Sequence, residues 1–139
     1  MLNYFVSYAD TDAGGVLHHA RYIELAEQGY HSWLKGRGLS FRKLGRDHNL
    51  SLVIYDIAAE YRSAIFLEDE ILIETHLNAI DRRGLEWKTR ILKGEDVAFS
   101  MLTKMACLAS TTRSIVSVPD FLVEQLGYED RDAMSTGAE

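Results

Sequence analysis

Side chains able to do chemistry are concentrated in one stretch near the start of the chain, residues 8–22 (YADTDAGGVLHHARY). The stretch holds two carboxylates, Asp10 and Asp12, two adjacent histidines, His18 and His19, and a pair of glycines. Ionisable side chains are rarely buried and glycines weaken regular structure, so core packing explains this composition poorly. A carboxylate that faces an oxyanion-stabilising site is the equipment of a hydrolase. We therefore interpret the stretch as a candidate hydrolytic site.

A helix is expected directly after this loop, over residues 20–35, because apolar side chains with helical spacing begin there. They are Ile23, Ala26, Tyr30, Trp33 and Leu34. The free N–H groups and the positive dipole end of a helix start favour a negative charge that develops nearby. For an isolated D-x-D pair the simpler alternative is that Asp10 or Asp12 caps the helix and the histidines lie on the surface. The whole string with its helix favours catalysis, with Asp10 in a structural role.

The composition limits the class of protein. With 139 residues the chain is long enough for one domain with a real core, which we place at residues 1–126, followed by a polar tail, residues 127–139, that is expected to fray. The formal charge of −6 argues against a nucleic-acid partner. The single cysteine, Cys107, lies in an apolar run and is expected in the core of a protein from a reducing compartment. No leader or apolar run of roughly 20 residues opens or interrupts the sequence, which predicts a cytoplasmic protein without a transmembrane segment.

The elements that must position the site are strands. A first strand is predicted at residues 2–8, and four long strands at 50–62, 70–80, 85–92 and 97–110, with turns at 81–84 and 93–96. In two of them the apolar set Ile71, Ile73, Leu77 and Leu85, Trp87, Ile91 alternates with the polar set Glu74, His76, Asn78 and Glu86, Lys88, Arg90. Ser40 is expected to cap a brief helical turn through Leu44, and Pro119 to precede a short helix at residues 121–125.

These elements predict an α+β fold, in which a long antiparallel meander wraps around one central helix. One face of the sheet is dry, and the helix at residues 20–35 is the only sizeable helix available to cover it. Such a sheet leaves an edge strand unpaired, so we expect a homodimer that continues the sheet or buries the edge, or a homotetramer built from two such dimers.

Several features together resemble a known family: the first strand, the string DTDAGGV at residues 10–16, the histidine His19 at the helix start, and the long strands. They are similar to the hotdog-fold thioesterases of the hydroxybenzoyl-CoA thioesterase class, and in particular to the YbgC-type acyl-CoA thioesterases, over residues 3–126. Glu60 and Tyr61, followed by LED at residues 67–69, resemble a further segment of the family. The resemblance implies a single hotdog fold and hydrolysis of a short-chain or aromatic acyl-CoA. It implies no metal or redox cofactor, because coenzyme A belongs to the substrate, and acyl carrier protein is an alternative carrier.

The resemblance also assigns roles. Asp12 matches the catalytic carboxylate, acting as nucleophile through a mixed anhydride or as general base on water. The backbone N–H of His19 matches the group that polarises the thioester carbonyl, and its side chain is expected to orient Asp12, the water or the leaving thiolate. Substrate contacts are expected from Gly14, Gly15, Val16, His18, Tyr22 and Tyr61, and depth of the acyl pocket from Tyr22, Trp33 and Tyr55. Cations for the CoA phosphates are expected among Arg62, Arg82, Arg83, Lys104 and Arg113.

Two positions depart from the family pattern. His18 stands where relatives usually carry an aromatic residue, commonly Tyr, which affects the shape and polarity of the acyl pocket. Ala64 stands where they often carry Pro. Neither change removes the proposed chemistry.

Three alternatives stay open on the sequence. The main one is a non-catalytic module of the same fold that binds acyl-CoA or acyl carrier protein and has no need of a carboxylate at Asp12. A dehydratase of acyl thioesters is also compatible with the fold. A metal hydrolase would require Asp12, His18 and His19 to converge, and the sequence contains no H-x-x-x-H spacing that favours it.

Overall fold

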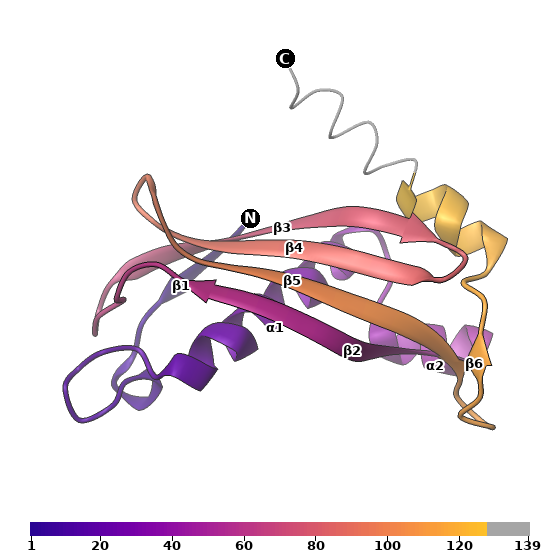
Figure 1. The fold of residues 1–139 in the computed structure, drawn as a ribbon, viewed down its shortest axis with the longest axis horizontal. Helices are drawn as coiled ribbons and strands as arrows, with labels where there is room; N and C mark the ends of the chain where they lie inside the picture. Colours follow the sequence, from indigo (N-terminus) through magenta and orange to yellow (C-terminus); the bar gives the residue numbers. More distant parts are fainter. Residues whose placement is uncertain (128–139) are drawn as a thin grey trace, which may run out of the picture.

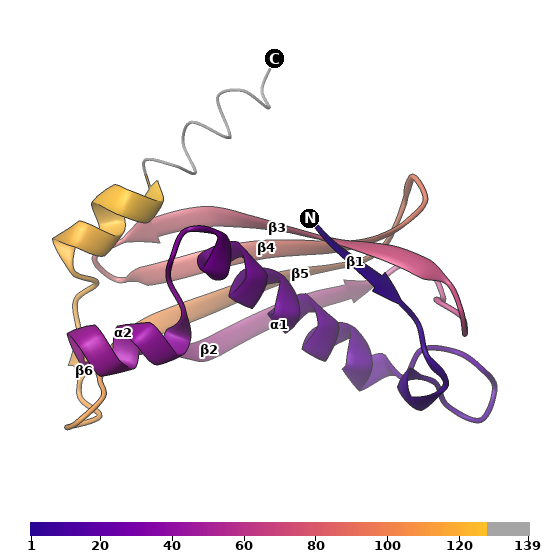
Figure 2. The ribbon, with the colours of Figure 1, turned by 180° about the vertical axis from the view of Figure 1, so that it is seen from behind.

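The computed structural model describes residues 1–127, and one helix lies across one face of a single antiparallel sheet (Figures 1 and 2). The helix is α1 (His19–Gly36), close to the predicted 20–35. The strands are β1 (Leu2–Phe5), β2 (Leu50–Tyr61), β3 (Glu70–Asp81), β4 (Gly84–Lys93), β5 (Asp96–Ala109) and β6 (Ile115–Val116). The predicted α+β architecture is confirmed. Of the predicted tail, residues 128–139 lie outside the described residues.

The strand order corrects the predicted meander. In space the order is β1-β3-β4-β5-β2, with β6 paired to β5. The β3-β4-β5 meander is as predicted, but β2 pairs with β5 and not with its sequence neighbour β3. The reason is the connection at residues 62–69, which crosses the end of the β4–β5 hairpin. The amides of Arg62 and Ser63 donate to the Ala98 carbonyl on one side, and Val6 N–H donates to the Asp69 carbonyl on the other. β2 is therefore an outer strand of the sheet.

Three local expectations also change. The first strand ends at Phe5 and not at Tyr8, because the chain turns into a 3₁₀ helix, η1 (Tyr8–Asp10). The predicted turn after Ser40 is a full helix, α2 (Phe41–His48), although Ser40 caps it as predicted, accepting from the Lys43 amide at 3.0 Å. The last helix occupies residues 120–127 within the described range, slightly longer than the predicted 121–125.

The core lies between α1 and the sheet. All six side chains predicted for the dry face of β3 and β4 are buried, and Cys107 is buried as predicted, which raises the pKa of its thiol to about 11. Glu74 is the exception on the polar face, since it is only 8% exposed. Burial alone would raise the pKa of Glu74, but hydrogen bonds from Arg90 and His76 outweigh burial and lower it. The ion pair with Arg90, on the neighbouring strand β4, is what makes this burial tolerable.

No helix within residues 1–127 has the length and apolarity that crossing a bilayer requires.

Candidate active site

The loop before α1 is held closed by backbone hydrogen bonds. Asp12 N–H donates to the Val16 carbonyl at 2.9 Å, and Gly15 N–H donates to the Asp12 carbonyl at 3.0 Å. Gly15 has φ 74°, in the left-handed region that glycine adopts without strain. The loop is also fastened to the 62–69 connection, because Leu17 N–H donates to the Ile65 carbonyl at 2.7 Å. A segment rich in glycine is thereby fixed at the end of the sheet.

The two aspartates of the loop have opposite environments. Asp10 is 5% exposed, and its carboxylate accepts from the Tyr4 hydroxyl, the Ser7 amide and Arg21 Nε, each at 2.8 Å. Burial alone would raise the pKa of Asp10, but these hydrogen bonds outweigh it and lower the pKa. With its oxygens occupied, Asp10 ties the first strand, the loop and α1 together.

Asp12 is exposed, and only one of its two carboxylate oxygens accepts hydrogen bonds. Its Oδ1 accepts from the amides of Gly14 at 2.9 Å and Val16 at 3.3 Å, which fixes the carboxylate in place. Its Oδ2 has no hydrogen-bond or ion-pair partner among the residues that the structure describes. One oxygen therefore anchors the group, and the other has no partner among the described residues.

The start of α1 leaves one backbone donor available. His18 is the N-cap, and its Nδ1 accepts from the Ala20 amide at 3.2 Å, while its ring stacks on that of His19 with centroids 4.4 Å apart. Within residues 1–127 the His19 amide has no acceptor. The Tyr61 hydroxyl, at the end of β2, donates to the His19 carbonyl at 2.6 Å. The helix dipole adds positive potential at this amide.

Asp12 and His19 line a common hollow of about 440 Å³. Of the residues predicted from the sequence, six line it: Asp12, Val16, His19, Tyr22, Tyr61 and Arg62. Three other predicted residues do not line the hollow but belong to the backbone around it: Gly14, Gly15 and His18. No hydrogen bond joins the Asp12 carboxylate to the His19 ring. Sequence reasoning missed Leu17, Ser63 and Ala64; the small pair Ser63-Ala64 after a long strand was the available signal.

Tyr22 forms a wall of the hollow and positions its neighbours. The side chain is 4% exposed, and its hydroxyl accepts from the Ile65 amide at 3.2 Å and donates to the Ser63 carbonyl at 3.4 Å. Its ring contacts those of Tyr61 and Phe99. Burial raises the pKa of Tyr22, so the phenol stays neutral and keeps its donor. The hydroxyl thus fixes the backbone of the 62–69 connection against α1.

The predicted cations are divided between the two ends of the sheet. Arg62 lines the hollow and pairs with Glu60 at 3.3 Å. Arg82 and Arg83 occupy the β3–β4 turn, and Arg113 lies after β5, all at the far end of the sheet from the hollow (Figure 1). Arg82 pairs there with Asp120 at 3.6 Å, and Arg83 lines another hollow with Lys104 and Tyr55.

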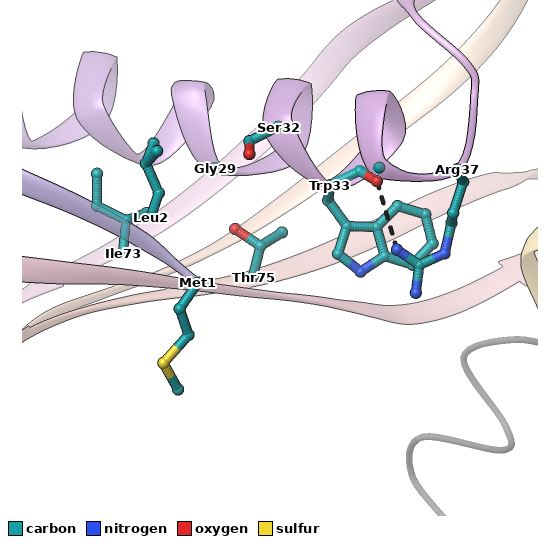
Figure 3. Close-up of a pocket in the computed structure, with 9 residues that line it drawn as sticks. Met1, Leu2, Gly29, Ser32, Trp33, Arg37, Ile73 and Thr75 are labelled. Atoms are coloured by element: carbon teal, nitrogen blue, oxygen red, sulfur yellow. Dashed lines mark hydrogen bonds between the residues drawn. The ribbon is translucent and has the colours of Figure 1, made fainter.

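A separate cavity of about 220 Å³ lies between α1, β1 and β3, with Met1 and Leu2 on one side and the stacked Trp33 and Arg37 at one end (Figure 3). Its lining contains no carboxylate or imidazole that could activate the Ser32 or Thr75 hydroxyl. In the part of the chain that the structure describes, no three His, Cys, Asp or Glu side chains gather as a metal ion would require.

Comparison with known proteins finds a matching family model, related sequences and a similar solved structure. A family model described as the thioesterase-like superfamily matches residues 6–126. An acyl-CoA thioesterase YbgC from Haemophilus influenzae is 28% identical over 74% of this chain and 76% of its own length. A 1,4-dihydroxy-2-naphthoyl-CoA hydrolase from Microcystis aeruginosa is 25% identical over 86% of this chain and 87% of its own. The crystal structure of a 1,4-dihydroxy-2-naphthoyl-CoA thioesterase from Synechocystis, 18% identical, superposes with a TM-score of 0.81 over 91% of this chain and 93% of its own.

Proposed function

The chain belongs to the thioesterase-like superfamily, with the hotdog fold and the thioester-hydrolase activity that its sequence predicts, and we propose that it hydrolyses acyl-CoA with Asp12 as the catalytic carboxylate. The observation that carries this proposal is the pairing of a free carboxylate oxygen with a free helix-start amide. Asp12 Oδ2 and the His19 N–H lack partners among the described residues, and both residues line the same hollow. A thioester is activated enough that one carboxylate and one oxyanion donor suffice.

The proposed reaction begins with the thioester carbonyl in the hollow, its oxygen accepting from the His19 amide. As general base, Asp12 takes a proton from a water molecule whose oxygen attacks the carbonyl carbon. The tetrahedral oxyanion, held at the helix start, collapses and expels the CoA thiolate. As nucleophile, the Asp12 carboxylate attacks the carbonyl carbon and the C–S bond breaks to release the CoA thiolate, and water then cleaves the mixed anhydride to the free acid and the Asp12 carboxylate. A single turnover in ¹⁸O-labelled water that leaves label in the Asp12 carboxylate identifies the anhydride route with water attack at the Asp12 carbonyl, whereas water attack at the acyl carbonyl puts the label in the product acid on either route.

The test of the function is thiol release from a panel of short-chain, long-chain and aromatic acyl-CoAs. Asp12→Asn keeps the acceptor for the Gly14 and Val16 amides but removes the charge, so the loop stays formed while kcat falls about a hundredfold to ten-thousandfold. Asp47→Asn, an exposed carboxylate on α2, is the matched control and leaves kcat unchanged. Wild type that binds these compounds but releases no thiol would be a binding module. A fully active Asp12→Asn would refute the assigned role.

We extend the proposal to a dimer formed through the free side of β2. Every residue from 54 to 61 is exposed, so its own chain covers this part of the strand only in part. Antiparallel pairing of two copies along all of β2 (Leu50–Tyr61) sets Ile54 opposite Ile57, and these two side chains are each 39% exposed. In the same two-fold arrangement, the end of the sheet that carries Arg83 and Lys104 in one subunit lies toward the end that carries Arg62 in the other subunit. Both subunits then supply cations for the CoA phosphates at each site.

The dimer has its own test by sedimentation. Ile57→Glu places a charge in the centre of the paired strands, so it yields monomers and lowers activity. Leu102→Glu is the control, since Leu102 lies on β5, is 36% exposed and points to the opposite face from α1. It keeps the β2-paired dimer, although it would break a tetramer assembled through that face. An Ile57→Glu protein that remains dimeric would refute the β2 interface.

A further inference from the structure

Two peptide units meet at the Cα of His19, at the start of α1, and each is held by its neighbours. The unit that joins His18 to His19 carries the N–H proposed as the oxyanion donor, and its carbonyl accepts from the Arg21 amide at 2.8 Å. The unit that joins His19 to Ala20 is held at both ends. The Tyr61 hydroxyl donates to its carbonyl at 2.6 Å, and its N–H donates to His18 Nδ1 at 3.2 Å. Because peptide units are planar, these contacts together set the direction of the His19 N–H.

The contact from His18 depends on the charge of its ring. An Nδ1 that accepts a hydrogen bond carries no proton, so neutral His18 holds its proton on Nε2. Protonation places a hydrogen on Nδ1 as well, and the Ala20 N–H would then face another donor. The imidazolium would also lie at the positive end of the helix dipole. A protonated His18 therefore gives up its position as cap, and the His19–Ala20 unit keeps only the contacts at its carbonyl.

The ring of His19 adds to this dependence on charge. The two histidine rings are stacked, with centroids 4.4 Å apart and an interplanar angle of 27°, and both residues are exposed. Two imidazolium rings repel one another, so the stack is favoured only while one of them is neutral. Histidine is the residue type whose charge changes between about pH 5 and 8, which makes the geometry of this helix start dependent on pH.

The other charged groups near the helix start have partners of their own or belong to the hollow. The titratable and charged side chains of the elements around it are Asp10 and Asp12 in the loop, Arg21 on α1, and Glu60, Tyr61 and Arg62 at the end of β2. Arg21 pairs with Asp10 at 2.8 Å, and Arg62 pairs with Glu60 at 3.3 Å. Within residues 1–127 no side chain hydrogen-bonds to the His18 ring, so the backbone contact is the hydrogen bond that protonation breaks.

Protonation of His18 also has an opposing effect, because a positive ring near the hollow would favour an oxyanion. His18 is exposed and does not line the hollow, so solvent screens this charge and leaves the effect small. Loss of an N-cap acceptor changes the stability of a helix start by about fivefold in equilibrium constant. Loss of the cap is the larger effect, so activity falls as the pH falls.

We propose that neutral His18 is a positioning residue for the oxyanion donor: it holds the His19–Ala20 peptide unit, and its protonation releases that unit and slows thioester hydrolysis. This inference rests on the proposed function. It also gives a role to a position at which the sequence departs from the family pattern, because a phenyl or phenol ring has no ring nitrogen to accept from the Ala20 amide.

The first experiment compares kcat/KM at pH 8 and pH 5.5 for the acyl-CoA of the panel that wild type hydrolyses fastest. Carboxylates as a class change charge mainly below about pH 5, so this window isolates imidazole titration. We expect wild-type kcat/KM to fall about fivefold at the lower pH. In His18→Asn the amide oxygen accepts without titrating, so the ratio of kcat/KM at the two pH values should be about one. His48→Asn, an exposed histidine at the end of α2, is the matched control and keeps the wild-type ratio.

His18→Phe separates the effect of His18 from that of His19. It keeps a ring for the stack and removes the acceptor at every pH, so kcat/KM should be about fivefold below wild type at pH 8 and fall no further at pH 5.5. A wild-type ratio in either His18 variant would show that another group, such as His19, titrates, and would overturn the inference. So would a wild-type kcat/KM that does not fall at pH 5.5. Absence of thiol release from wild type at both pH values would overturn the proposed function instead.

NMR tests the His18 contact independently of activity. In protein labelled with ¹⁵N-histidine, the ring signals that are missing from His18→Asn belong to His18, and their chemical shifts at pH 8 report which nitrogen carries the proton. We expect the proton on Nε2, and an Ala20 amide signal that shifts between pH 8 and pH 5.5 in wild type but not in His18→Asn. A proton on Nδ1 at pH 8, or an Ala20 signal that does not respond to pH, would overturn the inference whatever the enzyme assays show.

Discussion

At Gly29 the helix α1 packs closely against β3, and replacement of this glycine tests the helix-to-sheet packing that positions the candidate active-site loop. A Cβ added at Gly29 would lie 2.2 Å from Thr75 Oγ1 and 3.0 Å from Ile73 Cγ2. Contacts this short force the Thr75 side chain, the helix or the strand to move. We therefore predict that Gly29→Ala destabilises the protein, although alanine is the better helix former.

The magnitude follows from two opposing effects. Alanine gains about 1 kcal/mol over glycine in a helix interior, whereas overpacking a core costs about 1–3 kcal/mol and more for severe contacts. With a contact of 2.2 Å, we expect a net loss of about 2 kcal/mol in the free energy of unfolding. Thr75→Ala removes the atom in contact, so the double variant should show a favourable coupling of about 1–2 kcal/mol between the two sites.

The assay is urea unfolding followed by tryptophan fluorescence, since Trp87 is fully buried, at one fixed protein concentration because a dimer's stability depends on it. Gly45→Ala in α2 is the matched control. Its nearest neighbours, Leu50 O at 3.6 Å and Ser110 Oγ at 3.8 Å, leave room for a Cβ. This control should gain about 0.5–1 kcal/mol. A Gly29→Ala protein as stable as wild type, or a double variant that is merely additive, would refute the packing described for α1.

Three further predictions concern single groups. The pKa of Asp10 is lowered on folding, so its stabilisation is full above its ordinary value of 3.8 and is lost as the pH falls through the lowered value. Asp10→Asn should cost about 2 kcal/mol in urea unfolding at pH 7 and less below pH 3; an equal loss at both pH values would contradict this. Tyr61→Phe should reduce kcat/KM about fivefold with little change in Tm, because it removes the hydroxyl that donates to the His19 carbonyl. Cys107, whose pKa is raised to about 11, should react with a thiol reagent at pH 8 only after denaturation, and rapid native labelling would show that the strand opens.

Local patterns were sufficient to predict the helix, the strands and the conformation-setting residues of the candidate active-site loop. The alternation around Ile73 and Trp87 reports which face of a strand is dry, because side chains on a strand alternate with a period of two. Ser40 predicts a helix start. The string DTDAGGV before a helical repeat indicates a carboxylate beside a helix N-terminus. These inferences depend only on residues that are neighbours in the chain.

Other features depended on groups distant in sequence. Alternation gives the face of a strand but not its neighbour, so the pairing of β2 with β5 was set by the path of residues 62–69. Glu74 reads as solvent-facing and becomes buried only because Arg90 lies beside it on β4. The sequence analysis expects a structural role for Asp10, but the groups that hold its carboxylate, Tyr4 and Arg21, are distant in sequence and are identified only in the structure.

The sequence by itself determined the helix, the long strands and the position of the candidate active-site loop, because capping, periodicity and turn formation are local. Tertiary structure alone decided which oxygen of which aspartate stays free, that Tyr22 and Tyr61 fix the helix start to the sheet, and that the arginines divide between the two ends. These outcomes depend on long-range hydrogen bonds and burial, which arise only when strands far apart in the chain pack together.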